Sequence, residues 1–105
     1  MITRVWYGWT SKQNADAYEA LLKAEIIPGI AARKIAGCHG IELGRRDLGA
    51  EVEFMTIMQF ESLDAVHQFA GAQFETAVVP AKAQALLSRF DQKSAHYEVK
   101  LQLRF

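Results

Sequence analysis

Residues 2–10 read ITRVWYGWT, a stretch whose aromatic residues raise the question of what covers each of its two sides. Alternate residues of a β-strand point to opposite sides of its sheet. Large aromatic side chains fall on both sides of this strand, which carry Ile2, Arg4, Trp6 and Gly8 on one side and Thr3, Val5, Tyr7 and Trp9 on the other. We therefore predict a central strand in a sheet whose two faces are both covered.

Length and composition describe one globular domain, residues 1–105, with room for a substantial core. Twelve basic residues balance 12 acidic ones, and no basic stripe is present, which argues against nucleic acid as a partner. No apolar run approaches the roughly 20 residues of a membrane helix, and Arg4 interrupts any signal-peptide pattern. With the single cysteine Cys38, these features predict a cytoplasmic protein without disulfides or a membrane partner.

The region after the first strand has helical spacing. Its apolar residues recur at intervals of three and four and predict an amphipathic helix, with Thr10 or Ser11 as the N-cap. Pro28-Gly29 ends or kinks this helix, and residues 30–33 add one more turn. Two strands follow, CHGIELGRR (residues 38–46) and EVEFMTIMQF (51–60), joined by a turn at residues 47–49.

The rest of the chain predicts a helix in two parts and a last strand. Ser62 caps the first part, SLDAVHQFAG, and Gly71 ends it. The second part runs from about residue 74 to residue 90, with a kink at Pro80. The final segment, SAHYEVKLQLRF (residues 94–105), alternates in polarity and predicts the last strand.

This order of elements predicts an α+β, ferredoxin-like βαββαβ fold. Its antiparallel four-stranded sheet has the strand order fourth, first, third, second, with both helices on one face. The other face is apolar and would be bare in a monomer. We therefore expect a homodimer in which two sheets pack face to face, forming a dimeric α/β barrel.

Several stretches resemble the antibiotic biosynthesis monooxygenase-like family. They are RVWYGWT, AYEALL, PGI with GCHGIEL, EFMTIMQFESLDAVHQFAG and HYEV, and they extend over nearly the whole chain. The resemblance implies a dimeric α+β barrel. It also implies, for some members, oxygenation of phenols or quinols without a cofactor, because the bound substrate anion itself supplies electrons to oxygen. Haem-degrading members use an asparagine. The first strand of this chain has none, and the only asparagine of the chain is Asn14, near the start of the first helix.

The first and last strands carry the candidate catalytic residues. Arg4 and Trp6 share one side of the first strand, and His96 shares one side of the last strand with Glu98. In an enzyme, Trp6 would stack on the substrate and donate a hydrogen bond, Arg4 would stabilise an oxyanion and His96 would act as a base. The alternative is a core Trp6, an Arg4–Glu98 cross-strand ion pair and a structural His96.

Four further residues are candidates for substrate contact: Tyr18 on the sheet-facing side of the first helix, His67 beside the second helix stripe, and Phe54 and Met58 on the third strand. A buried Tyr18 bonded to the backbone and a surface His67 are the structural alternatives. No metal site is expected, because neighbours Cys38 and His39 point to opposite faces of a strand.

These features lead to two hypotheses about function. The first is a cofactor-independent monooxygenase that acts on a small aromatic or polyketide-like compound. The second is a non-catalytic, dimeric small-molecule-binding or stress-response protein of the same fold. The sequence does not decide which side of the first strand meets the helices, and the site requires that Trp6 faces them.

Overall fold

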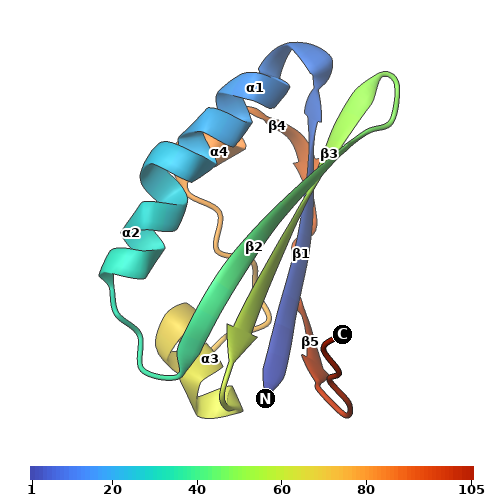
Figure 1. Cartoon of the computed structure of the whole chain (residues 1–105). Helices are drawn as coiled ribbons and strands as arrows, with labels where there is room; N and C mark the ends of the chain where they lie inside the picture. Colours follow the sequence, from blue (N-terminus) through green and yellow to red (C-terminus); the bar gives the residue numbers. More distant parts are fainter.

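Five antiparallel strands form one sheet, which the helices cover on one face in the computed structural model of residues 1–105 (Figure 1). The predicted α+β, ferredoxin-like fold is confirmed. The elements in chain order are β1 (Ile2–Ser11), α1 (Lys12–Leu21), a π-helical segment (Leu22–Ile26), α2 (Ile27–Ala32), β2 (Cys38–Asp47), β3 (Glu51–Phe60), α3 (Leu63–Ala70), α4 (Ala81–Gln84), β4 (Leu87–Phe90) and β5 (Ala95–Glu98). None of the helices has the length and apolar character needed to span a bilayer.

The strand order is β2-β3-β1-β4, with β5 also paired to β1. The predicted order is therefore correct, but two short strands share the place of the fourth. β4 lies along one half of β1 and β5 along the other, as Figure 1 shows. The pairing of β1 with β3 is unbroken from Ile2 opposite Phe60 to Ser11 opposite Glu51, which makes β1 the central strand.

The side of β1 that carries Arg4 and Trp6 faces the helices. On this side Arg4 and Thr10 are buried, whereas the alternate residues are only half-buried. The equivalent side of β3 carries Phe54 and Phe60, both fully buried. The helix face of the sheet therefore holds the core, and the other face has no cover within one chain.

The first helix begins at the predicted N-cap and continues through Pro28. The Ser11 hydroxyl accepts a hydrogen bond from the Asn14 N–H at 3.2 Å, which makes Ser11 the N-cap. Pro28 does not end the helix, which continues to Ala32. The turn before the proline widens instead, and the Ile27 N–H donates to the Leu22 carbonyl five residues back. Such π-helical turns are rare and cluster at functional sites.

The predicted helix over residues 74–90 is wrong. Only Ala81–Gln84 is helical, and Pro80 stands before it in an extended conformation (φ −60°, ψ 153°). Residues 71–80 form an irregular segment, and β4 follows α4. Proline excludes a continuous helix. Pairing of Phe90 with Gly8 in β1 then overrides the local helical pattern.

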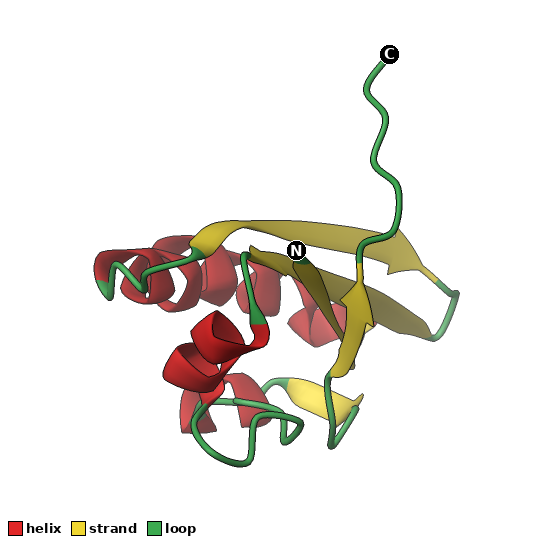
Figure 2. Cartoon of the chain, turned by 90° about the horizontal axis from the view of Figure 1, so that it is seen from below, coloured by secondary structure: helices red, strands yellow, loops and turns green.

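The predicted last strand is too long. β5 ends at Glu98, and residues 99–105 have no regular structure and project away from the sheet (Figure 2). The reason is the length of β1, because Glu98 already lies opposite Ile2, and the Val99 N–H donates to the Met1 carbonyl. Beyond this point the chain offers no partner strand, and Leu101 and Phe105 are exposed.

The contribution of the core to stability can be tested at Phe54. The buried ring of Phe54 packs edge-on against Tyr18 with 4.8 Å between ring centroids. We expect Phe54→Ala to lower the free energy of unfolding by about 3–5 kcal/mol, because it removes a large side chain and leaves a cavity. The exposed Phe105→Ala is the matched control and should change it by less than about 0.5 kcal/mol. Urea unfolding at one protein concentration measures both, and equal losses would contradict the described core.

Candidate active site in a cavity between sheet and helices

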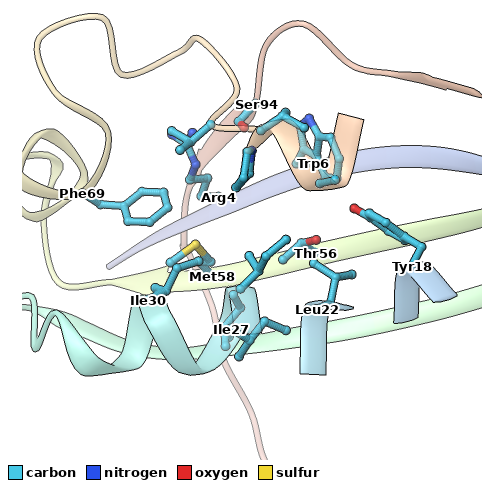
Figure 3. A pocket seen from close by; sticks show the side chains of 16 residues that line it. Arg4, Trp6, Tyr18, Leu22, Ile27, Ile30, Thr56, Met58, Phe69 and Ser94 are labelled. Atoms are coloured by element: carbon cyan, nitrogen blue, oxygen red, sulfur yellow. The ribbon is translucent and has the colours of Figure 1, made fainter. Parts of the chain in front are cut away.

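A cavity of about 70 Å³ lies between the helix face of the sheet and the first helix. Twelve of its 16 lining residues are hydrophobic, and Figure 3 shows their side chains around the space. Its hydrogen-bonding side chains other than Trp6 are Arg4, Tyr18, Thr56 and Ser94. Val78, Val79 and Pro80 of the irregular segment form another part of the wall. The cavity is thus apolar, with a few polar groups at fixed places.

Four of the seven predicted site residues line this cavity: Arg4, Trp6, Tyr18 and Met58. The other three do not. Phe54 lies fully buried against Tyr18, His67 packs at a tilt against Phe74 with 4.7 Å between ring centroids, and His96 contacts the Arg4 side chain. Side chains of β1, β3 and α1 therefore line the cavity, and both histidines lie outside its wall.

The Arg4 guanidinium is the most unusual group of the site. Only 4% of this residue is exposed, and its Nη1 donates to the Phe74 carbonyl oxygen at 2.6 Å and contacts His96 Nε2 at 2.9 Å. Its Nη2 donates to the Thr76 carbonyl oxygen at 3.4 Å. The alternative of an ion pair with Glu98 is wrong, because Glu98 lies opposite Ile2 and pairs with Lys100 at 3.0 Å.

No carboxylate compensates the charge of Arg4. Burial lowers the pKa of Arg4 to about 10, so the guanidinium is still charged at neutral pH. The ring of Phe69 lies 5.2 Å from the guanidinium carbon and adds a cation–π contact. Buried charges are normally paired, and this one leaves a positive potential at one end of an apolar cavity.

His96 holds Arg4 in place. It lies opposite Arg4 in the pairing of β5 with β1, and its Nε2 accepts from the guanidinium, so the ring proton is assigned to Nδ1. Burial, followed by the Arg4 charge, lowers the pKa of His96, and Glu75 opposes this shift. A neutral imidazole that faces Arg4 rather than the cavity favours a positioning role over that of a base.

Trp6 forms a wall of the cavity rather than a donor to a ligand. Its indole Nε1 donates to the Asp91 carbonyl oxygen at 2.8 Å, which excludes the predicted hydrogen bond to a substrate in this geometry. The ring lies across Gly8, where an added Cβ would come within 2.7 Å of Trp6 Cη2. The glycine therefore sets the orientation of the indole, and only the ring of Trp6 is offered to a ligand.

Tyr18 presents a free hydroxyl to the cavity. The residue is 1% exposed, and burial raises the pKa of its phenol to about 12, so it stays protonated at neutral pH. Figure 3 shows its oxygen directed into the space, on the same side as the Thr56 hydroxyl. The backbone hydrogen bond of the structural alternative for Tyr18 is absent, and the hydroxyl is available as a neutral donor and acceptor.

Sequence reasoning missed several lining residues for two reasons. Thr56 stands between Phe54 and Met58 on the same side of β3, and the period of two could have identified it. Ser94 and the residues 78–80 lie in segments whose structure the helical pattern misrepresented.

No group of three or more His, Cys, Asp or Glu side chains is placed to hold a metal ion, and His39 contacts Glu61 at 3.1 Å.

The contact between His96 and Arg4 predicts a dependence of stability on pH. The pKa of His96 lies below its ordinary value of 6.5 in the folded protein, so the unfolded chain binds more protons on acidification. The stabilisation by neutral His96 is full above pH 6.5 and is lost as the pH falls through the lowered pKa. We expect the difference in free energy of unfolding between wild type and His96→Gln to shrink over this range in urea titrations. Parallel pH curves for the two proteins would contradict this role.

Comparisons with known proteins identify the fold. No protein-family model and no curated protein matches the sequence. A Bacillus cereus protein, provisionally identified as an antibiotic biosynthesis monooxygenase, has a similar structure with a TM-score of 0.70 at 14% identity, over 100% of this chain and 96% of that one. Rv0793 from Mycobacterium tuberculosis and PA3566 from Pseudomonas aeruginosa each have a TM-score of 0.59 at 20% identity. They cover 97% and 93% of this chain, and 96% and 94% of their own. The chain therefore has the α+β, ferredoxin-like fold of antibiotic biosynthesis monooxygenase-like proteins.

Proposed function

We propose that the cavity binds a small aromatic compound as its anion and promotes its oxygenation by molecular oxygen without a cofactor. The observation that carries this proposal is the buried charge of Arg4, which lines an apolar cavity and has no carboxylate partner. A ligand with a negative oxygen would compensate the charge and fill the apolar space. The provisional identification of the Bacillus cereus protein as a monooxygenase supports the same proposal.

The size of the cavity favours a single ring. A volume of about 70 Å³ corresponds to roughly five to seven water-sized spaces. A single ring therefore fills the enclosed space, with its substituents towards the Arg4 and Tyr18 ends, and fits better than a polycyclic polyketide. A larger substrate would require the wall at residues 78–80 to move.

The lining residues supply binding and electrostatic stabilisation. Arg4 would stabilise the ionised oxygen of the substrate, while Trp6 and Met58 would pack against the ring. The Tyr18 hydroxyl would orient a second polar substituent. In the reaction of a hydroquinone, one oxygen atom enters the ring and the other leaves as water, whose two hydrogens and two electrons come from the substrate.

One observation favours the second hypothesis, a protein that binds a small molecule and catalyses nothing. The cavity lining contains no Asp, Glu, His or Cys, so no side chain is placed to act as a general base near neutral pH. An oxygenase of this kind would depend on Arg4 to favour the substrate anion. Oxygen consumption distinguishes the two functions, because a binding protein would retain the ligand without it.

We expect chelator-treated protein to consume oxygen with single-ring quinols, and Arg4→Gln to lower kcat/KM by roughly 10²-fold or more. The reason is the loss of the charge that stabilises the substrate anion. An oxygen electrode measures this rate.

Arg33→Gln is the matched control for this variant. The Arg33 guanidinium carbon also lies over the Phe69 ring, 5.3 Å from its centroid, but Arg33 is exposed and lies outside the cavity. Equal rates for the two variants would contradict the role of Arg4. Binding without oxygen consumption for any quinol would favour the binding protein.

We also propose that a second copy of the chain covers the uncovered sheet face. The half-buried side chains Val5, Tyr7, Met55 and Ile57 lie at the centre of this face on the paired strands β1 and β3. Trp9 lies beside them, with the Arg89 guanidinium 3.9 Å from its ring centroid and a hydrogen bond to Glu53 at 3.2 Å. An apolar centre with a charged rim is the usual anatomy of an interface.

The dimer can be tested at the centre of this face. We expect Ile57→Lys to convert a dimer to a monomer in light scattering, because a buried unpaired ammonium opposes association. Leu48→Lys, at an exposed turn, is the control and should leave the mass unchanged. A monomeric wild type, or a dimeric Ile57→Lys variant, would contradict the proposed interface.

A further inference from the structure

We infer that the ligand of the cavity carries a carboxylate and that both carboxylate oxygens accept hydrogen bonds from Arg4. This inference rests on the ligand site of the proposed function and not on the oxygenation, because the anionic group at Arg4 would be a carboxylate in place of an ionised ring oxygen. It follows from the hydrogen bonds that Arg4 already makes and from those that it leaves open.

Three of the five N–H groups of the Arg4 guanidinium have partners in the protein. Both Nη1 hydrogens are used, one by the Phe74 carbonyl oxygen at 2.6 Å and one by His96 Nε2 at 2.9 Å. One Nη2 hydrogen is directed to the Thr76 carbonyl oxygen at 3.4 Å. The donors that remain are Nε–H and the second Nη2–H.

The remaining donors lie on one edge of the guanidinium. Phe74 and Thr76 are two residues apart in one segment, and their carbonyls approach Nη1 and Nη2 respectively. The inference places both carbonyls at the end that these two nitrogens share. The open edge is formed by Nε and Nη2. Two parallel N–H groups in this arrangement match the two oxygens of a carboxylate, whereas a phenolate offers them only one oxygen.

Ser94 adds a further donor at this end of the cavity. Figure 3 shows its side chain beside that of Arg4, and the residue is 5% exposed. Its backbone N–H is used by the Glu75 carbonyl at 2.7 Å, but its hydroxyl makes no hydrogen bond within the protein. A carboxylate oxygen that accepts one bond from Arg4 has a further lone pair for this hydroxyl.

The rest of the cavity fixes the remainder of the ligand. Between Arg4 and Tyr18 the wall is apolar, with the indole of Trp6 on one side and Met58 on the other, which suits an aromatic ring. The hydroxyls of Tyr18 and Thr56 lie away from the Arg4 end and suit a neutral polar substituent. The inferred ligand is thus a small aromatic carboxylate with a polar group across the ring.

Calorimetric titration with three matched compounds tests this inference: 4-nitrobenzoate, 4-nitrobenzamide and, at a pH where it is ionised, 4-nitrophenolate. We expect the wild type to bind the benzoate roughly tenfold or more tightly than the other two. Arg4→Lys keeps the charge and loses the two-pronged edge, so it should lose the preference for benzoate over phenolate and keep that for an anion over the amide. Arg33→Lys should behave as wild type, and circular dichroism checks that each variant is folded.

Tighter binding of the phenolate would overturn the carboxylate inference and leave the proposed site for an aromatic anion in place. An unchanged preference in Arg4→Lys would overturn it as well. Failure of all three compounds to bind would overturn both the inference and the proposed ligand site. The wild-type preference alone decides the question if Arg4→Lys does not fold.

Discussion

A single buried guanidinium on the central strand organises this protein. Arg4 reaches from β1 to two main-chain carbonyls, at Phe74 and Thr76, and to the imidazole of His96. Those contacts require that the segment around residue 74 is irregular. In a helix the Phe74 carbonyl would accept from the amide four residues later and would be less available to Arg4. The same segment continues into Val78 and Val79, so the charge that would bind a ligand also holds one wall of its cavity.

The cavity exists because several local departures from regular structure coincide. Gly8 leaves room for the indole of Trp6, whose N–H is then fixed by the Asp91 carbonyl. The π-helical turn before Pro28 widens the first helix where Leu22 and Ile26 line the space. Each departure sacrifices some stability, since a regular strand or helix with a filled core would be more favourable. Their convergence on one cavity is typical of a site selected for function rather than for packing alone.

The sequence specifies the sheet far better than the site. Alternation in residues 2–10 and 51–60, together with the turn between residues 47 and 51, predicts both long strands and the strand order, because these signals are local. The helix expected after residue 74 fails because Pro80 and the pairing of Phe90 with Gly8 act over long range. The same contrast between local signals and long-range contacts holds for the residues of the site. Arg4, Trp6, Tyr18 and Met58 follow from the strand and helix periods, whereas Ser94 and the open edge of Arg4 depend on contacts that no pattern in one chain reveals.

Nuclear magnetic resonance titration of ¹⁵N-labelled protein with 4-nitrobenzoate tests whether an anion binds at the buried Arg4 guanidinium. The two tryptophan indoles report on the two faces of the sheet, Trp6 in the cavity and Trp9 on the uncovered face, and the Arg4 Nε–H reports on the charge itself. We expect a large downfield shift of the Arg4 Nε–H and a change at the Trp6 indole, with the Trp9 indole unmoved. An unmoved Arg4 Nε–H, with shifts confined to Trp9, would show that this anion does not bind at the buried guanidinium.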